Sequence, residues 1–93
     1  MIQSVVSEFF MQEPQNLKEK RAILKRILTR AKQKFNVSIA ETDFQDLWQR
    51  TEISFAVVSS SHIQAEKEAR EVLAFLDSFP EWERAETTME KLL

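Results

Sequence analysis

Basic side chains are concentrated in one segment of this 93-residue chain. Eight of the thirteen Lys and Arg residues lie between residues 16 and 35, where Glu19 is the only acidic residue, so this segment carries +7 and the rest of the chain −9. Lys and Arg side chains on one helix can follow a phosphate backbone, because neutralising phosphates releases condensed counterions. The pattern favours a surface that binds nucleic acid or another anion, with candidates Lys18, Lys20, Arg21, Lys25 and Arg30.

The start of this segment carries cations where a helix normally prefers acids. Asn16 and Glu19 have the N-x-x-E spacing of a capping box, which predicts a helix start at Asn16. Lys18, Lys20 and Arg21 then lie near the positive end of the helix macrodipole, where each cation costs roughly 0.3–1 kcal/mol. We therefore expect nearby carboxylates or an anionic ligand to compensate them. The alternative for the whole segment is a solvated face, neutralised by the acidic remainder of the chain.

A second group of chemically active side chains follows this helix. Glu41, Asp43 and Asp46 can pair with Lys20 and Arg21 in a structural salt-bridge cluster. They can also ligate a hard cation such as Mg²⁺, but the neighbouring basic residues compete for the same oxygens, and we expect no metal. The functional alternative is a partner-binding loop, in which the tryptophan is either a packed lid or an aromatic contact residue. Its members are Asp43, Gln45, Asp46, Trp48, Gln49 and Arg50.

The composition excludes most familiar enzyme chemistry. The chain has no glycine, so glycine-bearing phosphate loops cannot form. It has no cysteine and a single histidine, His62, which removes thiol nucleophiles, zinc sites and paired-histidine metal centres. The carboxylates have no recognisable nucleophile or oxyanion partner beside them. We expect a non-enzymatic protein without a cofactor, with His62 on its surface.

Two helices are predicted by capping residues and by apolar spacing. The first spans residues 16–35, with apolar residues every three or four positions, and Asn36 is predicted as its left-handed stop because the chain has no glycine. The second begins after Ser61, the start of another capping-box pattern, and ends before Pro80. Both helices would bury one apolar stripe.

Four segments are predicted as strands by β-favouring composition or by alternation. They are residues 1–11, 37–41, 51–59 and, with poorer alternation, 82–91. The connection at 42–50 is long for a tight turn, and Asp43 is a candidate cap for a short helical turn within it.

The resulting order is β-α-β-β-α-β in a single domain, residues 1–93. It predicts an α+β ferredoxin-like plait, with two helices on one face of a four-stranded antiparallel sheet. This topology brings the start of the first helix and the 42–50 connection to the same end of the sheet. The other sheet face is uncovered, and an uncovered apolar face usually meets a partner or a second copy.

Nothing in the sequence indicates a membrane or an oxidising compartment. No apolar run approaches the roughly 20 residues of a membrane-spanning helix. The N-terminal residues lack a basic lead and carry Glu8 within the apolar stretch, unlike a signal peptide. We expect a cytoplasmic protein.

Two motifs give the chain a family resemblance. NLKEKR at 16–21 and FNVSIAETDFQDLWQR at 35–50, followed by AVVSS at 56–60, resemble the YlxP-like family, also called domain of unknown function 503. The resemblance implies a small bacterial cytoplasmic protein with a ferredoxin-like fold and no established catalytic residue. It also implies a gene beside those of translation initiation and ribosome-binding factors, which indicates ribosome assembly or translation.

Two functional hypotheses follow from the sequence. The first is a binding factor associated with ribosomal RNA or a ribosomal subunit, which uses the basic helix and the adjacent Asp43–Arg50 loop. The alternative is a homo-oligomeric or protein-interaction module that binds through the open face of the sheet.

Overall fold

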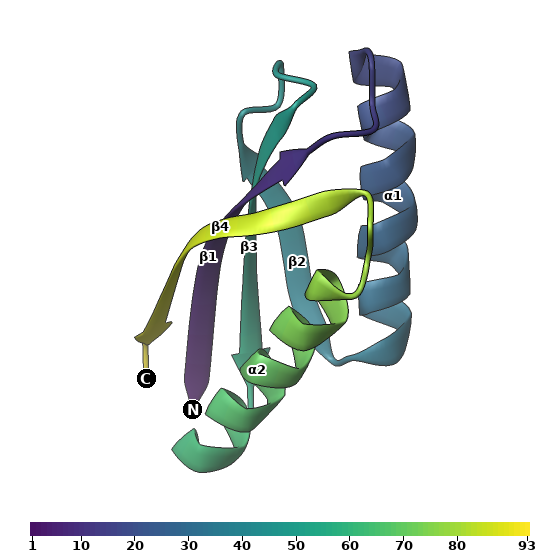
Figure 1. Cartoon of the computed structure of the whole chain (residues 1–93). Helices are drawn as coiled ribbons and strands as arrows, with labels where there is room; N and C mark the ends of the chain where they lie inside the picture. The colour runs from purple at the N-terminus through teal and green to yellow at the C-terminus, as the bar shows by residue number, and fades with distance from the viewer.

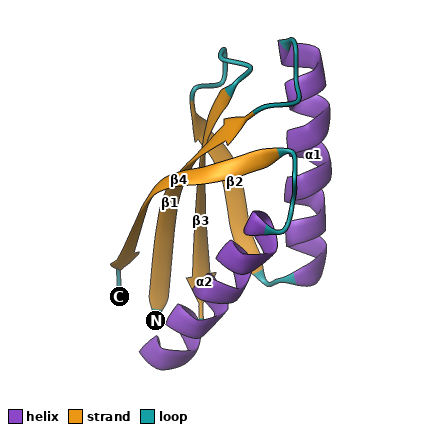
Figure 2. Cartoon of the chain, in the orientation of Figure 1, coloured by secondary structure: helices purple, strands orange, loops and turns teal.

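The six elements follow one another in the predicted order. The computed structural model describes residues 1–93. Its elements are β1 (Ile2–Met11), α1 (Leu17–Lys34), β2 (Val37–Asp43), β3 (Arg50–Val58), α2 (His62–Asp77) and β4 (Trp82–Lys91). The strands form one antiparallel sheet in the order β2-β3-β1-β4, and both helices lie on the same side of it (Figures 1 and 2). The predicted ferredoxin-like plait is confirmed.

The two central strands divide their side chains between the core and the open face. In β1, Val5 and Phe9 are fully buried against the helices, whereas Val6 and Phe10 point to the open face and are exposed. β3 alternates in the same way. The Phe9 ring stacks on Trp82 with their centroids 4.0 Å apart, which ties β4 to the core.

Both helix starts are capped as predicted. The Asn16 side chain accepts a hydrogen bond from the Glu19 N–H at 2.9 Å, and the Ser61 hydroxyl accepts one from the Gln64 N–H at 3.1 Å. The Glu19 carboxylate accepts in return from the backbone N–H of Gln15 and from the Asn16 amide. The sequence pattern therefore located both helix starts correctly.

α1 ends where the sequence predicts, but the left-handed conformation predicted for Asn36 is wrong. Asn36 does not have a left-handed backbone, because Phe44 is the only residue with a positive φ. The C-cap of α1 is Phe35, which is extended (φ −124°, ψ 151°) and whose N–H donates to the Ala31 carbonyl. The chain therefore turns from α1 into β2 through Phe35 and Asn36 without a left-handed residue.

The 42–50 connection is also more extended than predicted. β2 continues to Asp43, whose carboxylate accepts from the Phe44 N–H at 2.7 Å, and no helical turn follows. A tight turn closed by the bond from the Leu47 N–H to the Phe44 carbonyl takes its place. The poor alternation of β4 has a structural reason, since its pairing with β1 shifts register between Ser7 and Phe9.

The chain termini meet at the end of the sheet opposite the β2–β3 loop (Figure 1). The N–H of Ile2 bonds to the Leu93 carbonyl at 2.9 Å, and the Met1 ammonium donates to the Ser59 carbonyl. Neither helix has the length and apolar character that crossing a membrane requires.

Candidate functional site

Lys20 holds the β2–β3 loop against the first turn of α1. Its side chain is fully buried, and its Nζ lies 2.7 Å from the Phe44 carbonyl oxygen, 2.5 Å from that of Leu47 and 2.9 Å from that of Arg50. The same atom forms an ion pair with Glu41 Oε2 at 2.9 Å. A buried ammonium is tolerated only when it is paired and hydrogen-bonded, as it is here. The predicted proximity of the helix start and this loop is confirmed.

Phe44 is the unusual residue of this loop. Its φ of 61° lies in the left-handed region, which a bulky side chain rarely adopts and which costs about 1–3 kcal/mol. Three interactions offset that cost: Lys20 binds its carbonyl, the Leu47 N–H bonds to the same carbonyl, and the Arg50 guanidinium carbon lies 4.0 Å from its ring centroid. The loop is therefore held in one shape.

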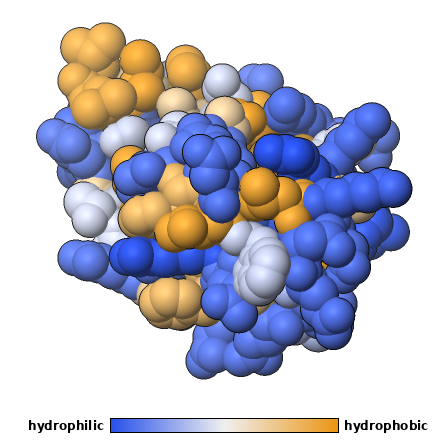
Figure 3. Space-filling view, turned by 90° about the horizontal axis from the view of Figure 1, so that it is seen from above, coloured by the Kyte–Doolittle hydropathy of each residue, from blue (hydrophilic) through white to orange (hydrophobic).

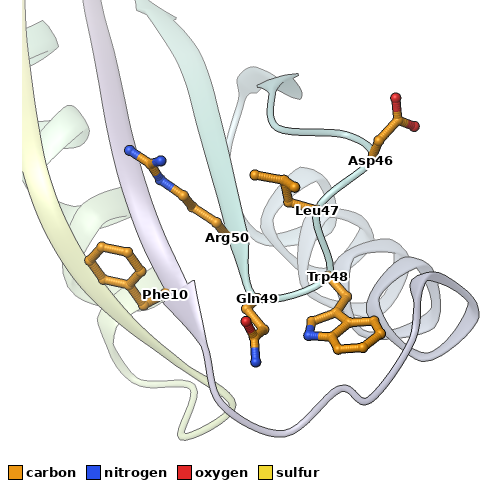
Figure 4. A pocket seen from close by; sticks show the side chains of 6 residues that line it. All are labelled: Phe10, Asp46, Leu47, Trp48, Gln49 and Arg50. Atoms are coloured by element: carbon orange, nitrogen blue, oxygen red, sulfur yellow. The ribbon is translucent and has the colours of Figure 1, made fainter.

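A hollow of about 410 Å³ opens between this loop and the end of β1 (Figure 4). Three of its lining residues are large apolar side chains that remain strongly exposed: Phe10 at 47%, Leu47 at 48% and Trp48 at 42%. The other lining residues are Asp46, Gln49 and Arg50, and Asp46 points away from the rest. Viewed from above, this end of the molecule shows apolar atoms between hydrophilic ones (Figure 3).

Four of the six predicted loop residues line this hollow, and two do not. Asp43 and Gln45 lie outside it, at the end of β2 and in the turn. The sequence hypothesis missed Phe10 and Leu47. Phe10 could have been found from the alternation of β1, which places it on the face opposite Phe9, whereas its proximity to Trp48 depends on the loop conformation.

Several carboxylates lie on the loop and strands beside the hollow. Arg50 forms an ion pair with Glu8, and this hydrogen bond, together with the charges of Glu8 and Asp43, raises the pKa of the Arg50 guanidinium. In the sheet, Phe10 of β1 pairs with Arg50 of β3 on one side and with Glu83 of β4 on the other. We use the term acidic rim for three carboxylates that have no ion-pair partner: Asp46, which lines the hollow, Glu52, two residues after Arg50 on the same face of β3, and Glu83, which pairs with Phe10 across the sheet.

On one side of α1 the cations have partners. Arg26 forms an ion pair with the largely buried Glu81 and is the main reason that the pKa of this carboxyl lies below its ordinary value. Arg30, one turn further, lowers the same pKa through its charge. Lys34 lies 5.1 Å from the ring centroid of Phe75 on α2. We call these three residues the inner row.

On the other side of α1 the cations have no partners. Arg21, Lys25 and Lys32 follow Lys18 by three, seven and fourteen residues, a spacing that places all four on one face of a helix. All four are exposed, and no carboxylate oxygen lies within 4.0 Å of their nitrogens. We call them the outer row. β2, which packs against α1, is an edge strand, so no further strand lies beyond it.

The structure thus separates the predicted anion-binding residues. Lys18, Arg21 and Lys25 stand together in the outer row, Arg30 belongs to the inner row, and the Lys20 ammonium is enclosed by carbonyl oxygens and Glu41. Lys32 was missed, although extending the three- and four-residue spacing along the helix would have found it.

No group of three or more His, Cys, Asp or Glu side chains is placed to hold a metal ion. The Glu41 carboxylate is occupied by Lys20 and by the Thr51 hydroxyl at 2.6 Å. His62 is exposed at the start of α2.

The chain is similar to known proteins along nearly its whole length. The family described as "Protein of unknown function (DUF503)" matches residues 2–89. The "Uncharacterized protein YlxP" of Bacillus subtilis (strain 168) is 57% identical over 90 residues, which cover 97% of this chain and 98% of that protein. Among solved structures, the de novo designed protein Ferredog-Diesel matches with a TM-score of 0.49 and 12% sequence identity. The match covers 98% of this chain and 85% of the designed chain.

Proposed function

We propose that this chain, which belongs to the family of proteins of unknown function DUF503, is a non-enzymatic binding factor for ribosomal RNA or a ribosomal subunit. The outer row of α1 would contact the phosphate backbone, and the adjacent Asp43–Arg50 loop would contact a partner in the same assembly. The supporting observation is the row of four exposed cations without a carboxylate partner.

The absence of partners for the outer row supports this proposal, because the chain has ample acid to supply them. It contains fifteen Asp and Glu residues, yet none forms an ion pair with Lys18, Arg21, Lys25 or Lys32. At a rise of 1.5 Å per residue the row extends over roughly 21 Å, enough to follow several phosphates. A phosphate near the helix start would also offset the unfavourable position of Lys18 in the macrodipole.

Sedimentation with purified ribosomal subunits at rising salt tests the proposal. The triple variant Arg21→Glu, Lys25→Glu, Lys32→Glu should lose at least about tenfold in affinity, and its dependence on log salt should flatten by roughly 0.7–0.9 per lost phosphate contact. The matched control reverses three exposed cations outside α1, through Lys67→Glu, Arg70→Glu and Lys91→Glu. Its net charge is the same, so it should bind much better than the outer-row variant.

Two results would contradict the proposal. One is no co-sedimentation of the wild-type protein even at low ionic strength. The other is equal loss of binding in the two triple variants, because the effect would then come from net charge and not from the outer row.

The open face of the sheet supports a second candidate, a homo-oligomer. Val6 and Val58 are 39% and 60% exposed on that face, and no helix covers it. Burying them against a second copy would remove apolar surface from water. Light scattering should then show a mass that rises with concentration and falls in a Val58→Lys variant, and a constant monomer mass would exclude this candidate.

A further inference from the structure

We infer that the hollow lined by Phe10, Leu47 and Trp48 docks a protein segment in which one apolar or aromatic side chain is flanked by Lys or Arg. This inference rests on the loop being a binding surface, as proposed above, and adds the chemistry of its partner. It does not require the outer row to bind RNA.

The β2–β3 loop is fixed by hydrogen bonds from the buried Lys20 side chain of α1. The Lys20 ammonium binds three of its carbonyl oxygens, and Glu41, which pairs with Lys20, also accepts from the Thr51 hydroxyl. A loop already fixed in one conformation loses little conformational entropy when it binds a partner. Lys20 is therefore a positioning residue, which holds Leu47 and Trp48 in place without touching the docked segment.

The lining of the hollow fits an apolar anchor. Phe10, Leu47 and Trp48 each leave more than two fifths of their surface exposed, although all three line one hollow of about 410 Å³ (Figure 4). A volume of this size lies within the range of ligand-binding pockets. Aromatic residues of this kind dominate the energetics of protein interfaces when a partner side chain fills the space between them.

The charges around the hollow select the flanking residues of the partner. The positive charge of Arg50 is already neutralised by Glu8, whereas the acidic rim of Asp46, Glu52 and Glu83 has no basic partner. Lys or Arg on either side of the anchor would complement this rim. The negative charge of this rim disfavours a phosphate in the hollow itself, so the hollow favours a basic protein segment over RNA.

The two tryptophans make a direct experiment possible. The Trp82 indole is buried and donates to the Leu76 carbonyl at 2.7 Å, whereas the Trp48 indole is exposed at the hollow, so their N–H resonances report different places. We would titrate the ¹⁵N-labelled full chain with the capped peptide Lys-Lys-Phe-Lys-Lys. The Trp48 indole signal should shift and saturate, and the Trp82 signal should stay in place.

Variants and control peptides make the experiment specific. Trp48→Ala, with binding followed at the backbone amides of Gln49 and Arg50, should weaken the peptide by about tenfold, and Asp46→Lys should weaken it by about threefold. A peptide with Glu flanks and one with Ser in place of Phe should shift the same signals only slightly. The outer-row triple variant should bind the peptide like the wild type, so that this inference and RNA binding can fail separately.

Three outcomes would overturn the inference. The first is a Trp48 shift of equal size with the Glu-flanked or the Ser-centred peptide. The second is unchanged peptide affinity in both Trp48→Ala and Asp46→Lys. The third is a single-stranded RNA oligonucleotide that moves the Trp48 signal at lower concentration than the basic peptide, which would assign the hollow to nucleic acid.

Discussion

The two rows of cations on α1 have similar chemistry and different electrostatic surroundings. In the inner row, Arg26 and Arg30 act on Glu81, and Lys34 lies over an aromatic ring of α2. In the outer row, no cation has a carboxylate or ring partner. The inner row faces Phe75 of α2 and Glu81, which precedes β4, whereas no acidic or aromatic side chain is paired with the outer row. The total charge of a helix is therefore a poorer guide to its binding surface than the position of the cations that have no partner within the fold.

The largest expected effect concerns Lys20, which belongs to neither row. Lys20→Met would leave Glu41 half-buried without its cation and would release three loop carbonyls. Removing one partner of a buried ion pair costs about 3–5 kcal/mol, so the free energy of unfolding in urea should fall by that amount. Lys25→Met is the control in the outer row, where we expect a change below about 0.5 kcal/mol. A loss below about 1 kcal/mol for Lys20→Met would mean that this lysine does not hold the loop.

The next effect compares matched arginines in the two rows. Arg26→Gln removes the partner of the largely buried Glu81 and should lower the free energy of unfolding by about 1 kcal/mol, because Arg26 itself is partly exposed. Arg21→Gln removes an exposed cation that has no partner and should change it by less than about 0.5 kcal/mol. Chemical denaturation of both variants would measure the difference. Equal values would show that the two rows are not distinct.

A third prediction uses pH to isolate the inner row. Because Arg26 holds the pKa of Glu81 below its ordinary value of 4.5, the charged carboxylate stabilises the fold. This stabilisation is complete above pH 4.5 and disappears as the pH falls through the lower folded-state pKa. The free energy of unfolding of Glu81→Gln should therefore depend less on pH in the acid range. Arg26→Gln should flatten the same curve, and a wild-type slope in both variants would contradict the assignment.

The smallest effect is expected at the start of the outer row. Lys18 lies in the first turn of α1, where the macrodipole disfavours a cation. Lys18→Glu should raise the free energy of unfolding by roughly 0.3–1 kcal/mol at low salt. It should also reduce the fraction of the protein that co-sediments with ribosomal subunits. Lys32→Glu, near the end of the helix, should weaken binding without stabilising the fold. A stability loss in Lys18→Glu would indicate that Lys18 has a structural partner.

Most of the fold could be predicted from the sequence, because its signals are local. Asn16 and Ser61 marked the helix starts through capping, and the alternation in residues 51–59 marked β3. The left-handed conformation at Asn36 and the helical turn after Asp43 were wrong, because β-sheet pairing extended β2 and tertiary contacts placed the left-handed residue at Phe44. One long-range contact, from Lys20, and two contacts within the loop, from Leu47 and Arg50, offset a strain at Phe44 that local propensity disfavours.

The candidate site was less predictable, because its residues come from separate segments. The sequence grouped Lys20 with exposed cations, and only the loop conformation shows that its ammonium is enclosed. Phe10 and Trp48 are far apart in sequence and line the same hollow only because of the conformation of the loop. The separation of the two rows could have been derived from helical spacing, but the position of Glu81 beside one of them could not.

The burial of Lys20 also has a consequence for covalent labelling. The other six lysines of the chain are exposed, and their amines can react with an acylating reagent in the folded state. Lys20 can react only when the loop carbonyls and Glu41 release its nitrogen. The rate at which this one amine is modified, followed by mass spectrometry, therefore reports how often the β2–β3 loop opens, and a partner seated in the hollow should slow it.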